Sequence, residues 1–318
     1  MTPKKIFTYR DPVHDDFAGT NIHTKPLPDW FLYRHTNPIW RSLACFVYRG
    51  LARPIAFCFR KIWGAHRFEN RQVLEKTAGQ GVYVYANHTQ RVMDAFLPCQ
   101  LRRKGRSYIV VGPDALSIPL IHNFIQMLGA IPLGSTMKQS REMAESVHSH
   151  IARGDLITIY PEAHIWLFYT GIRPFPAASF GYPARDGAPV YAMTSCYRKR
   201  RFGAFPKVVT YLDGPYFPDM SLPLPERKQK LRDQCHTAMV RRAEENSTYV
   251  YYEYREEALG NSSKTPPAVF AGGVQRIRKP CGVCRWKSGI FAAAQSAEHF
   301  SVRFCSNSAL RIMPRVRQ

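Results

Sequence analysis

The stretch NHTQRVMD (87–94) decides how this sequence is interpreted. It directly follows the β-rich run GVYVYA (81–86), so it lies where a predicted strand ends. His88 and Asp94 within it offer a general base and a carboxylate that could orient that base. Because ligands of open α/β sheets bind beyond the carboxyl ends of the strands, the stretch predicts a functional site at such an edge.

A second stretch, YPEAHIW (160–166), has the same character. It follows the apolar run DLITI (155–159), which is typical of a buried strand, and it brings Glu162 to the end of that strand. Strands of this kind alternate with amphipathic segments, and Asp94 is expected to cap a helix over 97–103. This alternation predicts an α/β fold with a mainly parallel sheet flanked by helices. The predicted strands are 81–87, 106–112, 130–133, 155–160, 189–195 and 207–214, and the predicted helices are 97–103, 114–128, 136–152 and 225–245.

Two further segments, GAIPLG (129–134) and APVYAM (188–193), complete a set of four ordered blocks. The set resembles the glycerophospholipid acyltransferase family, which contains the 1-acyl-glycerol-3-phosphate acyltransferases. That family carries Asn-His-x4-Asp, a Gly-x-Ile-Pro block, Phe-Pro-Glu-Gly-Thr-Arg and a Val-Pro-Ile/Val block. The resemblance covers residues 67–257 and is that of a bacterial-type variant with a His-x5-Asp motif.

The resemblance implies an enzyme that moves an acyl chain from an acyl-CoA or acyl-carrier-protein thioester to a lysophospholipid hydroxyl, with 1-acyl-glycerol-3-phosphate as the expected acceptor. His88 would take the proton of the hydroxyl, and Asp94 would hold the other ring nitrogen. No covalent acyl-enzyme, no cofactor beyond the thioester co-substrate and no metal are expected. The implied substrate-binding residues are Asn87, Thr89, Gln90, Glu162 and His164.

The spacing of the proposed dyad restricts its local structure. Five residues separate His88 from Asp94, and six steps along a helix would leave their side chains about 240° apart. They can therefore meet only if the intervening residues form a loop. The alternative is a strand-end histidine and a capping aspartate that have no joint role.

Two basic residues that the family uses to hold a phosphate are missing. Ala163-His164-Ile165 stands in place of Gly-Thr-Arg, and Leu133-Gly134 follows Ile-Pro where an arginine is expected. Lys138, Arg141 and Arg173 are the candidate substitutes, since basic side chains are well suited to bind phosphate. The acceptor could instead be a non-phosphate lipid or a glycan hydroxyl.

The chain is strongly basic, with a net charge of +22 and a pI of about 9.9. Such a surface favours an anionic partner, and we expect an anionic membrane rather than nucleic acid. A rival interpretation is therefore a basic membrane or nucleic-acid binding protein with a degenerate catalytic fold. Eight scattered cysteines and a polar N-terminus indicate a reduced, cytoplasmic setting.

The segment 38–63 is aromatic and apolar but contains several arginines. It offers no run of about 18 uncharged apolar residues, so no spanning helix is expected. Pro54 is expected to break or kink it, which gives a pair of amphipathic helices that lie in the plane of an anionic membrane, at its cytoplasmic face. The alternative is that these helices pack on the catalytic domain with their arginines facing water. The expected membrane-binding residues are Trp40, Arg41, Arg49, Arg53, Arg60 and Trp63.

The chain thus divides into four predicted parts. Residues 1–37 form an extended arm, 38–66 the interfacial helices and 67–257 the acyltransferase domain. Residues 258–318 carry ten basic residues and one acid without apolar periodicity, and are expected to be a disordered or loosely attached tail.

Overall fold

The computed structural model describes residues 3–18, 26–63, 66–102, 105–113 and 122–257. The prediction for the tail, residues 258–318, lies outside these ranges. A seven-stranded sheet has the order β2-β8-β7-β3-β6-β4-β5, and only the β7–β8 pair among these neighbours is antiparallel. The prediction of an α/β fold with a mainly parallel sheet is therefore confirmed. Its strands are β2 (Arg67–Glu69), β3 (Val82–Ala86), β4 (Ser107–Val111), β5 (Ala130–Pro132), β6 (Leu156–Ile159), β7 (Val190–Arg198) and β8 (Lys207–Tyr216).

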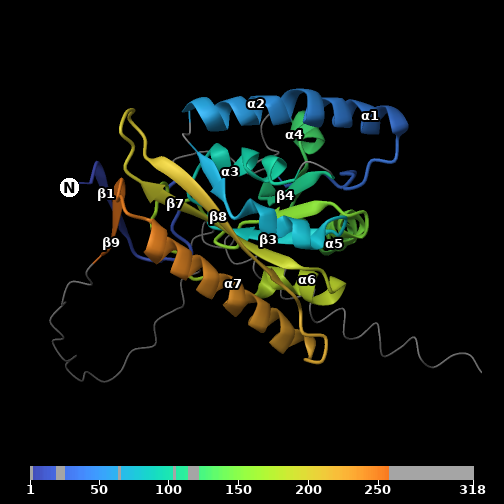
Figure 1. Ribbon diagram of the computed structural model, residues 1–318. Coiled ribbons are helices and arrows are strands. Elements are labelled where there is room, and N and C mark those ends of the chain that lie inside the picture. The colour runs from blue at the N-terminus through green and yellow to red at the C-terminus, as the bar shows by residue number, and fades with distance from the viewer. Residues whose placement is uncertain (1–2, 19–25, 64–65, 103–104, 114–121, 258–318) are drawn as a thin grey trace, which may run out of the picture.

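Helices cover both faces of this sheet (Figure 1). Tyr83 and Tyr85 of β3 point to the face covered by α5 (Met137–Ala152), α6 (Gly181–Asp186) and α7 (Leu224–Asn246). Val82 and Val84 point to the opposite face, where residues of the 3₁₀ turn Arg71–Thr77 join the core. This alternation is the two-residue period of a strand buried on both faces.

The helix predicted after His88, over residues 97–103, is wrong. No helix spans 97–103: α3 (Met93–Phe96) is followed by the 3₁₀ turn Pro98–Gln100. Asp94 lies inside the first turn of α3, and the residue at its N-cap is Val92. Pro98 explains the early end, because it has no N–H to donate to the carbonyl of Asp94 four residues back, and that carbonyl accepts from the Tyr160 hydroxyl instead.

The N-terminal helical segment continues through Pro54, where a break or a kink was predicted. It comprises α1 (Pro38–Phe46), a π-helical stretch (Val47–Ala52), α2 (Arg53–Cys58) and a second π-helical stretch (Phe59–Trp63). Arg53 N–H donates to the carbonyl of Tyr48, five residues back, so the turn before Pro54 is wider than an α-turn. By length and composition alone Pro38–Lys61 could cross a membrane, contrary to the expectation from the sequence.

The exposed side of this helical segment carries large apolar side chains together with Arg41 and Arg49. Ala44, Tyr48 and Ala56 face the domain, while the opposite side exposes large apolar side chains. Arg60 is buried, and its guanidinium donates to the Gln100 side chain and to the carbonyl of His66. The prediction that Arg60 lies on a membrane-facing flank is therefore wrong, because that part of the helix turns into the domain. The exposed apolar side chains are Ile39, Leu43, Phe46, Leu51, Ile55 and Phe57.

The other predicted membrane contacts differ in position. Arg41 and Arg49 are exposed, whereas Arg53 is half-buried and donates to the carbonyl of Arg102. Trp40 is half-buried and stacks on the ring of His35 at 4.2 Å. Trp63 ends the helical segment, and its side chain lies outside the described part of the structure.

The predicted N-terminal arm contains a strand where none was predicted. β1 (Lys5–Tyr9) pairs in parallel with β9 (Tyr252–Glu256), which makes a separate two-stranded sheet (Figure 1). Rings from both strands contact Trp166, with Tyr254 stacked at 4.8 Å and Tyr9 at 4.7 Å. The two ends of the described chain therefore meet beside the second sequence block.

Candidate active site

The end of β3 is fixed to its neighbour β7 by Asn87. The Asn87 amide nitrogen donates to the carbonyl of Ser195 at 3.1 Å, and its oxygen accepts from the N–H of Ser195 at 2.8 Å. The side chain is buried, so it continues the ladder between the strands. This arrangement supports His88 structurally and differs from the substrate-binding role expected for Asn87.

A loop connects His88 to α3 and brings the proposed dyad together, as the spacing requires. His88 Nδ1 lies 2.8 Å from Asp94 Oδ2. The same carboxylate oxygen accepts the backbone N–H groups of Thr89 at 3.0 Å and Gln90 at 2.9 Å. Asp94 therefore holds both the imidazole ring and the loop that carries it.

This hydrogen bond selects the tautomer of His88. A proton on Nδ1 satisfies the bond to Asp94, which leaves Nε2 as the nitrogen that can accept a proton. The His88 side chain is 19% exposed and that of Asp94 only 3%. The ring also stacks on Tyr160, with centroids 4.5 Å apart, and the Tyr160 hydroxyl donates to the carbonyl of Asp94 at 2.6 Å. A base with one accessible nitrogen on a fixed ring is suited to general-base chemistry.

Glu162 lies behind this dyad and is buried. Its Oε2 accepts the backbone N–H of His88 at 3.1 Å, and its Oε1 accepts that of Arg173 at 3.1 Å. The Arg173 guanidinium lies 3.4 Å from the Glu162 carboxylate and also donates to the carbonyl of His164. Burial raises the pKa of Glu162, and Arg173 opposes that shift.

Glu162 and Arg173, which were expected to bind the acceptor, are both enclosed by these contacts. The Arg173 side chain is 1% exposed and that of Glu162 is 0% exposed. Burial lowers the pKa of Arg173, and the neighbouring carboxylate opposes that effect. The pair therefore fixes the chain between 162 and 173 beneath His88. A ligand phosphate cannot reach Arg173 without displacing this packing.

Ala163 replaces the glycine of the family block and keeps the backbone shape of a glycine. Its φ is 62°, in the left-handed region that favours glycine, and it stands where the family has Gly. The turn that places Glu162 beneath His88 therefore requires this backbone shape. Here a side chain of one carbon tolerates it, at a cost of roughly 1–2 kcal/mol.

The other expected binding residues have different surroundings. Thr89 is buried, and its hydroxyl bonds to that of Tyr197 at 2.6 Å. Gln90 is also buried, but its side-chain nitrogen has no hydrogen-bond partner among the described residues. His164 is half-buried. Gln90 is therefore the residue of this group with an unused buried donor beside the dyad.

Lys138 and Arg141 do not join the dyad. Both lie on α5, which follows the edge strand β5, whereas His88 follows the central strand β3. Their side chains are 75% and 76% exposed, and they form surface pairs with Glu142 and Glu145. Three strand spacings of about 4.8 Å separate β5 from β3.

Sequence reasoning missed three groups that shape the site. Tyr160, the aromatic residue that opens the second stretch, stacks on His88, and Tyr197 at the end of β7 holds Thr89. Arg91 donates to the carbonyl of Ala18, so residues 15–18 of the arm lie against the site. The position of Tyr160 in the second stretch could have predicted its contact with His88. The contact between Arg91 and the arm joins distant parts of the chain, so no local sequence pattern predicts it.

A buried polar chain extends from the site to the N-terminal helix. Asn87 bonds to the backbone of Ser195, whose hydroxyl lies 2.8 Å from that of Thr210. The Thr210 hydroxyl lies 2.7 Å from His66 Nε2, and the carbonyl of His66 accepts from Arg60. Burial, and secondarily Arg60, lowers the pKa of His66 to about 3. His66 is therefore neutral in the folded protein near neutral pH.

This shift predicts acid sensitivity. Between its ordinary pKa of about 6.5 and about 3, His66 takes up a proton more readily in the unfolded chain, so stability falls as pH falls through that window. The loss should approach roughly 1.4 kcal/mol per pH unit from this group. Chemical denaturation at several pH values should show a shallower loss in His66→Gln than in the wild type. If the free energy of unfolding fell equally with pH in both proteins, His66 would not be the group that causes the loss of stability at low pH.

A surface groove of about 1070 Å³ lies elsewhere, between the end of β8 and α7. Its lining includes Tyr216, Gln229 and Arg241 but no histidine. The groove does not contain the histidine–aspartate pair, so the candidate active site is placed at the end of β3, where His88 and Asp94 lie.

A half-buried histidine that an aspartate orients, at the carboxyl edge of a mainly parallel sheet, is typical of α/β enzymes that use a general base. Residues 65–195 match the family model described as Acyltransferase. This segment is thus a domain of the acyltransferase family, and the family resemblance of the four blocks is confirmed. The chain is also similar to the 1-acyl-sn-glycerophosphate (LPA) acyltransferase PlsC from Thermotoga maritima, at 16% identity and a TM-score of 0.45, over 65% of this chain and 79% of that one. That likeness is too low to transfer substrate or mechanism. No curated protein matches the chain.

Proposed function

We propose that this acyltransferase moves an acyl chain from an acyl-CoA or acyl-carrier-protein thioester to the hydroxyl of a lysophospholipid. The hydrogen bond of 2.8 Å between His88 and Asp94 carries the proposal. It leaves Nε2 of His88 as a base on a partly exposed ring. The expected acceptor is 1-acyl-glycerol-3-phosphate, as the family resemblance implies.

In this mechanism His88 Nε2 takes the proton of the acceptor hydroxyl as its oxygen attacks the thioester carbonyl. The tetrahedral intermediate collapses with release of the thiolate, which takes the proton back from His88. Asp94 stabilises the imidazolium between the two steps. The unused amide donor of Gln90 supports a role in binding the substrate or the developing oxyanion.

A second candidate acceptor is a non-phosphate lipid or a glycan hydroxyl. Its support is the burial of Arg173 and the distance of Lys138 and Arg141 from the central strand. These were the cations expected to replace the two missing basic residues. A phosphate would then need another partner.

The test is incubation with labelled acyl-CoA or acyl-carrier protein and a panel of acceptors, with products identified by mass. The panel contains 1-acyl-glycerol-3-phosphate, other lysophospholipids, monoacylglycerol and a glycolipid. Transfer to phosphate-bearing acceptors alone supports the first candidate, and transfer to monoacylglycerol or glycolipid supports the second. Absence of transfer with every donor and acceptor would support the rival, a binding protein that keeps the fold.

The protein is further proposed to work as a peripheral enzyme at the cytoplasmic face of an anionic membrane. The exposed apolar side chains of 38–61 support this, with Phe46 at 62% and Ile55 at 57% exposure. The other side of the same helix packs on the domain, which favours a helix lying in the membrane plane. Arg41 and Arg49 are exposed and would face lipid headgroups.

Phe46→Ser combined with Ile55→Ser should weaken binding to anionic vesicles by at least about tenfold. Each side chain contributes on the order of 1 kcal/mol or more when it leaves water. Vesicle flotation measures the change. Met220→Ser, which is 57% exposed and precedes α7, is the matched control and should bind normally. Equal binding of all three proteins would favour packing without membrane contact.

A further inference from the structure

The loop between β7 and β8 carries a concentration of positive charge beside an exposed aromatic ring. Residues 198–207 read RKRRFGAFPK, without an acid. We name residues 199–206 the cationic loop. Lys199 and Arg201 are exposed in it, and Phe202 is 74% exposed. The Arg201 guanidinium lies 5.3 Å from the centre of the Phe202 ring.

The cationic loop is held in place at its base. Lys4 Nζ donates to the carbonyl of Ala204 at 3.1 Å. Phe205 stacks on Phe168 at 6.0 Å. The charged tip therefore projects from a braced hairpin.

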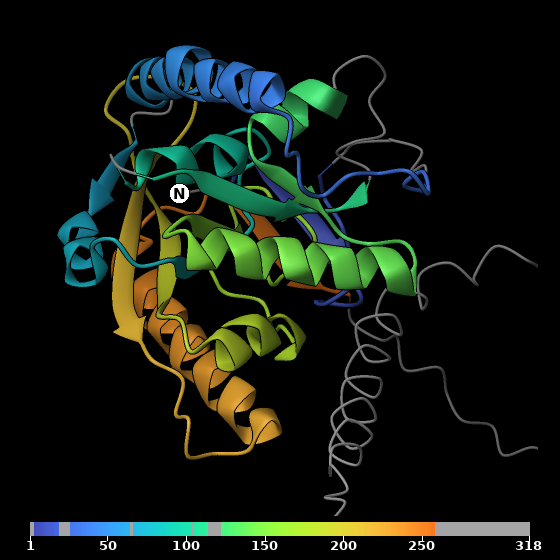
Figure 2. The same cartoon turned by 90° about the vertical axis from the view of Figure 1, so that its right-hand side faces the viewer.

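The cationic loop extends past the catalytic edge of the sheet. Ala86, the last residue of β3, pairs with Met193, and β7 continues to Arg198 before the loop begins. His88 lies at the same edge. Figures 1 and 2 show the β7–β8 loop rising to the side of the molecule on which α1 and α2 lie.

We propose that the cationic loop is a second membrane contact, which binds anionic lipid headgroups and places Phe202 at the interface. This inference rests on the proposed membrane association of 38–61. Basic side chains are attracted to anionic leaflets, and aromatic rings favour the headgroup level. The exposed ring and the shared side with the apolar helix favour a bilayer over an acidic carrier protein.

Two contacts would fix how the active site faces the lipid. The helix alone leaves the domain free to tilt about the helix axis, whereas the loop removes that freedom. The loop is also connected to the dyad region, since Phe168 N–H donates to the carbonyl of Thr89 at 2.9 Å and Tyr197 holds the Thr89 hydroxyl. An acceptor leaving the membrane between the two contacts would enter at the His88 edge.

The experiment compares Lys199→Gln/Arg201→Gln with Arg185→Gln/Lys228→Gln, which removes two cations from α6 and α7. Vesicles of phosphatidylcholine, with and without phosphatidylglycerol, are the probes. Binding to the anionic vesicles should fall by about 30-fold in the loop variant, since each basic residue near the surface contributes about fivefold. Binding to the neutral vesicles should not change, and the control should match the wild type.

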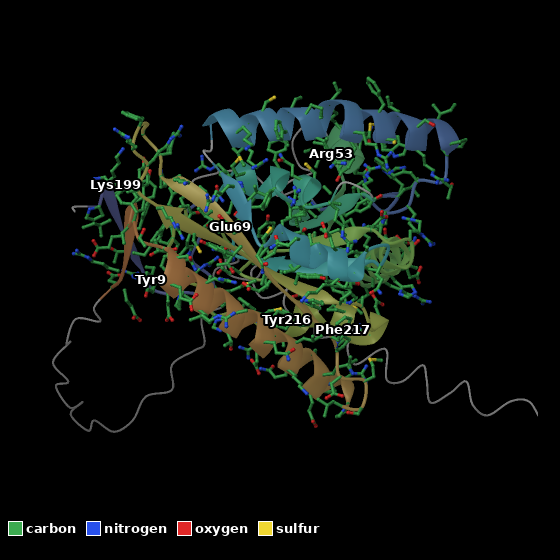
Figure 3. All side chains as sticks on the ribbon, in the orientation of Figure 1. Tyr9, Arg53, Glu69, Lys199, Tyr216 and Phe217 are labelled. Atoms are coloured by element: carbon green, nitrogen blue, oxygen red, sulfur yellow. The ribbon has the colours of Figure 1, made fainter. Side chains whose placement is uncertain are left out.

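A second measurement places the loop at the bilayer directly. Phe202→Trp should be quenched by brominated lipid more than Phe217→Trp, which is 58% exposed and lies beyond the opposite end of β8 (Figure 3). Equal quenching of both tryptophans, or unchanged vesicle binding of the loop variant, overturns the inference. The loop variant could instead bind vesicles normally and lose transfer only from acyl-carrier protein, not from acyl-CoA. That result would assign the loop to the carrier protein and would also overturn the inference. Failure of the wild type to transfer acyl groups to soluble acceptors would instead count against the proposed function.

Discussion

His88→Ala is expected to lower acyl transfer by roughly 10²–10⁴-fold while the protein stays folded. The structure gives the reason: the ring is held by Asp94 at 2.8 Å and by Tyr160 stacking, and its second nitrogen remains available. The only group of His88 that bonds to Glu162 is its backbone N–H, which alanine retains. The substitution therefore removes the base without breaking a buried ion pair. Turnover with labelled thioester and the melting temperature are measured together.

The matched control is His148→Ala. His148 Nδ1 also lies 2.9 Å from an aspartate, Asp186, but its side chain is 69% exposed on α5. It reproduces a histidine–aspartate pair without the catalytic position, so its turnover should equal that of the wild type. Normal turnover in folded His88→Ala protein would remove His88 from the mechanism.

Glu162→Gln is expected to destabilise the fold strongly. It leaves the Arg173 guanidinium buried without its counter-charge, which costs roughly 3–5 kcal/mol and lowers the melting temperature by roughly 10 °C. Adding Arg173→Met should recover part of the loss, because the unpaired charge is then gone. Thermal unfolding of the single and double variants measures both effects.

The control is Glu145→Gln, which breaks the surface pair with Arg141. An exposed pair contributes about 1 kcal/mol or less, so its melting temperature should change little. If Glu162→Gln instead keeps its melting temperature and raises the KM for the acceptor, the carboxylate faces substrate, as the family resemblance implies. The buried-pair interpretation would then be wrong.

The central strands could be predicted because a parallel strand buried on both faces is a continuous apolar run. The predicted range 155–160 is β6 extended by one residue at each end, and 81–87 relates to β3 in the same way. β1 and β9 were missed since their side chains are largely accessible and each forms only by pairing with the other. Both runs, KIFTY and YEYRE, contain strand-forming residues, but neither run indicates the distant partner that it needs.

The site was predictable to the same limited extent. The six-residue step from His88 to Asp94 required a loop, and the structure has one. The fate of Arg173 could not be deduced, because it depends on how the chain returns after Glu162. A cation that binds phosphate and one that neutralises a buried carboxylate look identical in sequence. Arg60 was misplaced for a similar reason: a straight helical projection ignores the π-helical turns that rotate it inward.

The parallel pairing of β1 with β9 has a consequence for how the protein is made. Lys5 pairs with Tyr252, so β1 must wait for a partner that lies 247 residues later in the chain (252 − 5). Contacts of such sequence separation form slowly, and until then the rings of β1 stay without their partners on β9. The arm beside Trp166 and the dyad loop would also be the last region to become ordered on the ribosome. The catalytic edge is thus completed only when nearly the whole domain has emerged.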